Sequence, residues 1–186
     1  RGHTFALFTS GASATNVVGE LDGRGRLLRQ VRRLGTTTAW ARMAIDAEDV
    51  LYVPESTTCR VRMVDTRATW GLGTPPAPVP ADTLLGSGCG AGQLGANHYM
   101  ATAVSGGLVF VVDAGCASTG SFPLCPGAST VFVFDPQNGN PATGYEIRRF
   151  PGPASAQDIA ALPSGDIVIL AGAYGAQKVH RYQPDG

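Results

Sequence analysis

Two carboxylates and one histidine are the side chains of this sequence best suited to chemistry. Glu55 ends the segment VLYVPE and Asp113 ends the similar segment LVFVVD, while His98 lies between them beside Tyr99. Carboxylate oxygens are ligands for Ca²⁺ and Mg²⁺, and histidine can act as a general base or a metal ligand. If the carboxylates converge, Glu55 and Asp113 hold a divalent cation, His98 is the candidate catalytic residue, and Tyr99 helps to line a ligand-binding pocket.

A structural role for the same residues is the alternative. Each carboxylate can accept hydrogen bonds from the amides of its own turn, and His98 can be a loop histidine without chemistry. The sequence favours this alternative, because the positions equivalent to Glu55 and Asp113 in two further repeats are Thr9 and Gly172.

Other signatures of catalysis or phosphate binding are weak. Gly90–Gly95 matches G-x-G-x-x-G, but a dinucleotide site needs that motif between a strand and a helix. Neither flanks it, so we expect a loop between repeats. The five arginines of Arg24–Arg33, echoed by Arg148 and Arg149, favour a solvated strand edge. Net charge is zero, which gives no support to a nucleic-acid partner, and no apolar run approaches the length of a membrane span.

The elements that position these residues are short strands in a repeating pattern. Met43–Asp46, Val50–Val53 and Arg60–Asp65 read as strands separated by polar turns. Similar apolar segments begin at positions 50, 108 and 167, so the unit recurs about every 58 residues. Repeats of this length made of four short strands are typical of propeller blades. With 25 Gly and 13 Pro in 186 residues and no helical periodicity, the sequence predicts an all-β fold.

The predicted fold is therefore a β-propeller of four-stranded antiparallel blades, about four in this chain, with a β-sandwich as the second choice. The approximate boundaries are blades at 1–35, 36–80, 96–152 and 153–186, and a loop at 81–95. The first and last blades each have three predicted strands, and these do not complement one another. We therefore expect either part of a longer propeller or an open ring completed by oligomerisation.

One unit of the sequence resembles a known repeat family. DAEDVLYVPESTTCRVRMVDT resembles the NHL repeat, and LLGSGCGAGQLGANHYMATAV looks like the glycine-rich connection between such blades. The resemblance implies a β-propeller. It implies no activity, because this fold carries scaffolds, lectins, lyases and lactonases alike.

The four cysteines have no metal-site spacing. Cys116 and Cys125 bracket a short excursion between two strands, which favours a disulfide between them. The pairing of Cys59 with Cys89 stays open, as does the alternative of free thiols. Disulfides would place the protein in an oxidising compartment: extracellular, on the cell surface or periplasmic.

The function expected from these features is a non-catalytic extracellular scaffold that binds a protein, a glycan or another ligand through its loop-rich face. A metal-dependent hydrolase or lyase of the lactonase-like propeller type, built on Glu55, Asp113 and His98, is the alternative. A repeat subunit of an extracellular assembly is a third.

Overall fold

The computed structural model describes residues 4–10, 15–35, 41–66, 83–117 and 127–183. Within these ranges the regular structure is β-strand, apart from one short 3-10 helix, η1 (Pro141–Thr143). No helix in the described residues is long and apolar enough to cross a membrane. The all-β prediction is confirmed.

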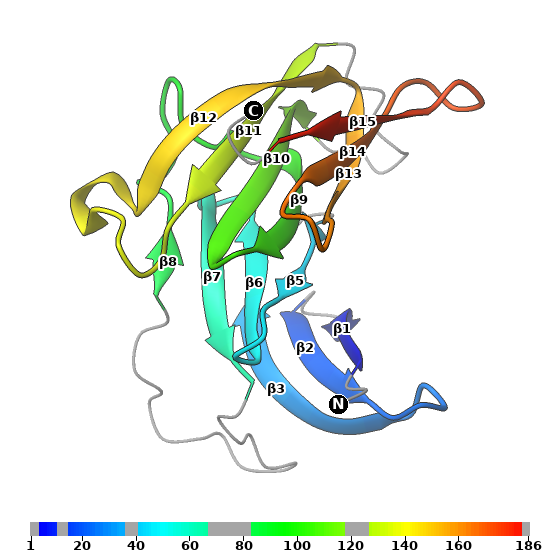
Figure 1. Cartoon of the computed structure of the whole chain (residues 1–186). Coiled ribbons are helices and arrows are strands. Elements are labelled where there is room, and N and C mark those ends of the chain that lie inside the picture. The colour runs from blue at the N-terminus through cyan, green and yellow to red at the C-terminus, as the bar shows by residue number, and fades with distance from the viewer. Residues whose placement is uncertain (1–3, 11–14, 36–40, 67–82, 118–126, 184–186) are drawn as a thin grey trace.

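In the described part of the chain the strands form four sheets that follow one another in sequence (Figure 1). The first sheet contains β1 (Thr4–Ser10), β2 (Thr15–Leu21) and β3 (Leu27–Gly35). The second contains β5 (Ala44–Ile45), β6 (Val50–Glu55), β7 (Arg60–Asp65) and β8 (Leu84–Leu85). The third contains β9 (His98–Ser105), β10 (Leu108–Ala117), β11 (Ala128–Phe134) and β12 (Glu146–Ala154). The fourth contains β13 (Ala156–Ala161), β14 (Ile167–Ala171) and β15 (Lys178–Tyr182).

Two details differ from the predicted pattern of four antiparallel strands. The third sheet carries a fifth strand, β4 (Ala41–Arg42), which pairs parallel to β9 with Ala41 opposite Met100. It occupies the edge of β9, where backbone groups would otherwise lack partners. The range 81–95, expected to be loop, contains β8, which pairs with β7.

Among the described residues, three apolar clusters fill the spaces between successive sheets. The first holds Val18 of the first sheet against Val53 of the second. In the next two, β10 contributes to both: Val109 and Val111 pack toward the second sheet, while Phe110 and Val112 pack toward the fourth. Both faces of β10 are buried, which explains why its segment Leu108–Val112 is apolar throughout instead of alternating. The sheets therefore stack in chain order.

Candidate functional site

Glu55 ends β6 and is 1% exposed. Its Oε1 accepts a hydrogen bond from Arg62 Nε at 2.6 Å, and its Oε2 accepts bonds from Arg62 Nη2 and the Thr58 hydroxyl, both at 3.1 Å. Both oxygens of this buried carboxylate are therefore bonded to groups of its own sheet. A charge removed from water needs such partners.

Asp113 lies where β10 departs from regular pairing with β9. The register shifts between Asp113 and Ala117, and Gly115 within this bulge has a φ of 74°. The bulge turns the Gly115 amide back to Asp113 Oδ1 at 2.8 Å, while Oδ2 accepts from the Gly95 amide at 2.6 Å. Asp113 thus ties the chain entering β9 to the far end of β10.

His98 completes this cluster. Its Nδ1 lies 2.7 Å from Asp113 Oδ1, and its side chain is 27% exposed. If Nδ1 carries the proton toward Asp113, Nε2 is the acceptor that remains. Gly95 is required for this arrangement, because a Cβ at that position would lie 1.8 Å from His98 Nδ1. The structure thus brings together two of the predicted site residues.

Tyr99 packs in the apolar cluster between the third and fourth sheets. Burial raises the pKa of Tyr99, and a hydrogen bond with Arg42 partly opposes that rise. The same hydrogen bond raises the pKa of Arg42. The ring of Tyr99 is therefore a core element with its polar atom bonded to Arg42.

The candidate carboxylates have different partners. Glu55 is bonded to Arg62 and Asp113 to His98. Within the described ranges, no group of three or more His, Cys, Asp and Glu side chains is placed to hold a metal ion. A Ca²⁺ or Mg²⁺ site on Glu55 and Asp113 stays a prediction.

A disulfide joins Cys59 to Cys89, with the Cα atoms 5.0 Å apart and a sequence separation of 30 residues. Cys59 is buried beside the turn that links β6 to β7, and Cys89 is exposed. The predicted Cys116–Cys125 bridge falls outside the side chains that the structure describes. A short loop between strands favours a bridge across that loop, whereas Cys59 and Cys89 are 30 positions apart and are brought together by the fold.

The disulfide is one of several ties on the segment 86–97, which runs from β8 to β9 and which we call the inter-blade connection. The Gly86 amide donates to Gly144 O at 2.8 Å, and the Asn97 amide donates to Ser56 O at 2.8 Å. Leu94 is buried in the cluster between the second and third sheets. The G-x-G-x-x-G segment lies within this connection and is followed by the strand β9 and not by a helix. The connection is thus fixed to both sheets that it joins.

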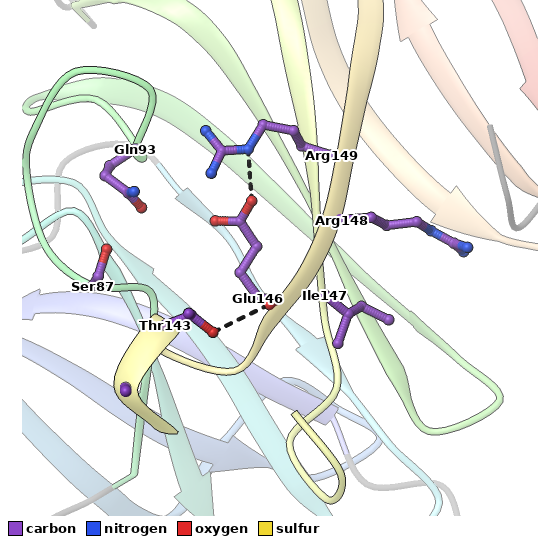
Figure 2. A pocket seen from close by; sticks show the side chains of 8 residues that line it. Ser87, Gln93, Thr143, Glu146, Ile147, Arg148 and Arg149 are labelled. Carbon is purple, nitrogen blue, oxygen red and sulfur yellow. Dashed lines mark hydrogen bonds and ion pairs between the residues drawn. The ribbon is translucent and has the colours of Figure 1, made fainter. Parts of the chain in front are cut away.

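A polar hollow lies between the inter-blade connection and β12 (Figure 2). Its volume is about 440 Å³, and it is lined by Ser87, Gln93, Ala142, Thr143, Glu146, Ile147, Arg148 and Arg149. Figure 2 shows Glu146 and Arg149 on the side of β12 that faces Gln93, with Arg148 projecting to the other side. Arg149 Nε lies 2.6 Å from Glu146 Oε1.

Sequence reasoning missed this hollow for an identifiable reason. Residues three apart on a regular strand point to opposite faces, so Glu146 and Arg149 read as unrelated. The register shifts here, however: Phe134 pairs with Glu146, but Val133 pairs with Arg148. The extra residue, Ile147, puts Glu146 and Arg149 on one face. No sequence signal beyond the Arg148–Arg149 pair marks the place.

Comparisons with known proteins give the fold and little else. No protein-family model matches the sequence, and no curated protein matches it either. Among solved structures, a chain in the crystal structure of the nidogen/laminin complex aligns with a TM-score of 0.55 and 13% identity. The alignment covers 98% of this chain and 57% of that chain, so this chain spans little more than half of the neighbour's length. With the four stacked sheets, this likeness shows that the chain has a β-propeller fold.

Proposed function

We propose that this chain is an extracellular β-propeller scaffold that binds a protein through its loop-rich end. The observation that carries the proposal is the fixed inter-blade connection, residues 86–97. It is tied to the second sheet by the Cys59–Cys89 disulfide and to the third by Asp113. A surface already ordered before association loses less conformational freedom on binding, which favours recognition.

The hydrogen bonds of the Asp113 and Glu55 carboxylates support the same function. The Asp113 carboxylate fixes the backbone of the connection through Gly95. The Glu55 carboxylate fixes the turn after β6 through Thr58. Both carboxylates bond to loops at this end of the sheets, so they stabilise the conformation of the proposed binding surface.

Tyr174 is the candidate anchor for a partner. It lies in the turn between β14 and β15 and is 93% exposed. The turn is closed by bonds from the Ala176 amide to Ala173 O and from the Gly175 amide to Gln177 Oε1. Tyrosine is enriched among the residues that contribute most to protein interfaces, and a short closed turn presents it with little freedom.

The proposed location and partner class rest on two supports. A disulfide is stable in an oxidising compartment, which fits an extracellular, cell-surface or periplasmic protein. The structural neighbour comes from a complex of two named proteins, nidogen and laminin. We carry over from it only the general idea of a propeller that docks a protein. A repeat subunit of an extracellular assembly would be one form of the same function.

The test is capture of a partner followed by measured binding. The immobilised chain is exposed to the extracellular protein fraction of its source, and any retained protein is purified and titrated against wild type, Tyr174→Ala and Asn97→Ala. We expect at least tenfold weaker binding by Tyr174→Ala. The control is Gln137→Ala, an exposed residue in the turn after β11, which should bind as wild type does. Equal affinity of all four proteins would contradict the proposal.

The second candidate is a metal-dependent hydrolase or lyase, and the His98–Asp113 contact is the observation that favours it. A cation at that cluster would stabilise the folded chain by mass action. Melting curves with about 5 mM CaCl₂ or MgCl₂ test it, since this concentration exceeds the usual Kd of extracellular calcium modules. A rise in Tm that is lost in Asp113→Asn would support the enzyme. We expect no such rise.

A further inference from the structure

The polar hollow between the inter-blade connection and β12 has two walls of different origin. The connection contributes Ser87 and Gln93, and the stretch from η1 into β12 contributes Thr143, Glu146 and Arg149. Its volume of about 440 Å³ lies within the range of about 300–1,000 Å³ usual for small-ligand sites. The hollow is therefore large enough for one ring-sized ligand.

On the face of β12 that points to the inter-blade connection, the charges of Glu146 and Arg149 balance, because Arg148, the third charged residue of the lining, projects to the other side (Figure 2). Arg149 Nε bonds to Glu146 Oε1 at 2.6 Å. A cationic ligand would therefore be repelled by Arg149, and an anionic ligand by Glu146. The guanidinium also lies over the Phe132 ring, 5.0 Å from its centroid, which adds a cation–π contact and fixes its plane. A guanidinium has two more nitrogens with donor hydrogens. The remaining donors of Arg149 thus stand beside the acceptor oxygens of Glu146, and a neutral ligand can bond to both.

The opposite wall offers groups that both donate and accept. The Gln93 amide and the Ser87 hydroxyl have this double capacity, and neither side chain is bonded to another residue in the described part of the chain. Figure 2 shows Gln93 facing the side of β12 that carries Glu146 and Arg149. A ligand that fits between these walls has neighbouring groups that each donate one hydrogen bond and accept another.

The geometry of the walls is fixed. The bond from the Gly86 amide to Gly144 O joins the two walls at the residues that precede Ser87 and follow Thr143. A Cβ at Gly92 would lie 3.2 Å from Arg149 Nη1, so glycine lets the connection approach β12 closely. The Cys59–Cys89 disulfide holds the same connection. Polar groups held in place lose little freedom when a ligand binds.

We propose that this hollow binds a neutral sugar ring through two adjacent hydroxyl groups. One hydroxyl donates to Glu146 and accepts from Arg149, and the other bonds to Gln93 or Ser87. Vicinal hydroxyls are neutral, and each can donate and accept a hydrogen bond, which matches the donors and acceptors on both walls. The hollow shares the inter-blade connection with the protein-binding surface proposed above, but the two proposals are tested separately, because that surface is probed at Tyr174 and Asn97 and the hollow at Gln93 and Glu146.

The test uses a panel of methyl glycosides of glucose, galactose, mannose and N-acetylglucosamine. Saturation-transfer NMR detects contact, and titration gives the Kd. We expect at least one neutral glycoside to bind, with a Kd at least tenfold weaker in Glu146→Gln and in Gln93→Ala. Gln137→Ala, outside the hollow, should bind as wild type does. Since Glu146→Gln removes an ion pair, Ser87→Ala, at an exposed position, provides a further variant that leaves the ion pair intact.

Three outcomes would overturn the proposal. One is the absence of contact with every neutral glycoside, and another is binding that none of the hollow variants weakens. The third is preference for a peptide: Gly-Asn-Gly with blocked termini is also neutral and bears donors and acceptors. If it binds at Gln93 and Glu146 while the glycosides do not, the hollow is a peptide site.

Discussion

Arg62 Nε lies 2.6 Å from Oε1 of Glu55, and the Glu55 side chain is almost wholly removed from solvent. This ion pair joins β6 to β7 directly below the turn that carries Cys59. Removing only the arginine leaves a buried carboxylate without its cation, a change that costs about 3–5 kcal/mol in proteins.

Arg62→Met should therefore lower the free energy of unfolding by about 3–5 kcal/mol in urea titrations. The double variant Glu55→Leu/Arg62→Met removes both charges and should recover part of that loss. If the single and double variants were equally unstable, loss of packing and not the unpaired charge would be the cause.

The Cys59–Cys89 disulfide should stabilise the fold by restricting the unfolded chain. Its cysteines are 30 residues apart, and disulfides closing loops of this size typically contribute about 2–4 kcal/mol. The variant Cys59→Ala/Cys89→Ala should lose that amount in urea titrations under oxidising conditions. Peptide mapping without reduction should recover the Cys59 and Cys89 peptides linked. An unchanged midpoint, or a different partner for Cys59, would contradict the assignment.

Gly144 should tolerate no side chain. It has a φ of 64°, and a Cβ there would lie 2.3 Å from the carbonyl carbon of Gly86. Gly106 is a matched control, because its φ is 57° but nothing lies within 4 Å of its added Cβ. Gly106→Ala should cost about 1–2 kcal/mol from the left-handed conformation alone. Gly144→Ala should cost clearly more, because the backbone of Gly86 must move. Equal losses would show that the close approach is not needed.

Tyr52 should make the fold sensitive to alkali. It is 4% exposed, and its hydroxyl donates to Asp46 Oδ2 at 2.8 Å. Burial raises the pKa of Tyr52 far above its ordinary value, and the bond to Asp46 raises it further. Because the folded state holds this proton more tightly, its contribution is complete below the unfolded-state pKa of about 10 and is lost as pH rises above it.

Urea titrations between about pH 8 and pH 11 check this expectation. The free energy of unfolding of the wild type should fall with pH above about 10. Tyr52→Phe, which has no proton to lose, should show a smaller fall. Parallel curves for the two proteins would exclude Tyr52 as the source.

The strands and turns could be predicted from short stretches of the sequence. Polar turns between short apolar runs place β6 and β7 correctly, and the apolar run Leu108–Val112 correctly indicates a strand buried on both faces. The recurrence of these units predicts stacked sheets. Strand alternation and turn chemistry act over a few residues, so the sequence contains them directly.

The candidate site was predictable only in part. Asp113 and His98 are candidates by their chemical types, but their contact lies beside a bulge at Gly115, which strand alternation does not predict. The polar hollow likewise depends on the register shift beside Ile147.

By itself, then, the sequence determined the strands, the turns and the repeat that makes the chain a propeller. The tertiary structure decided which distant groups meet: Cys59 with Cys89, and the inter-blade connection with β12. These contacts arise from the packing of one sheet on the next and from shifts of register. Both depend on the whole stack of sheets, whereas a turn or a strand depends on its own residues.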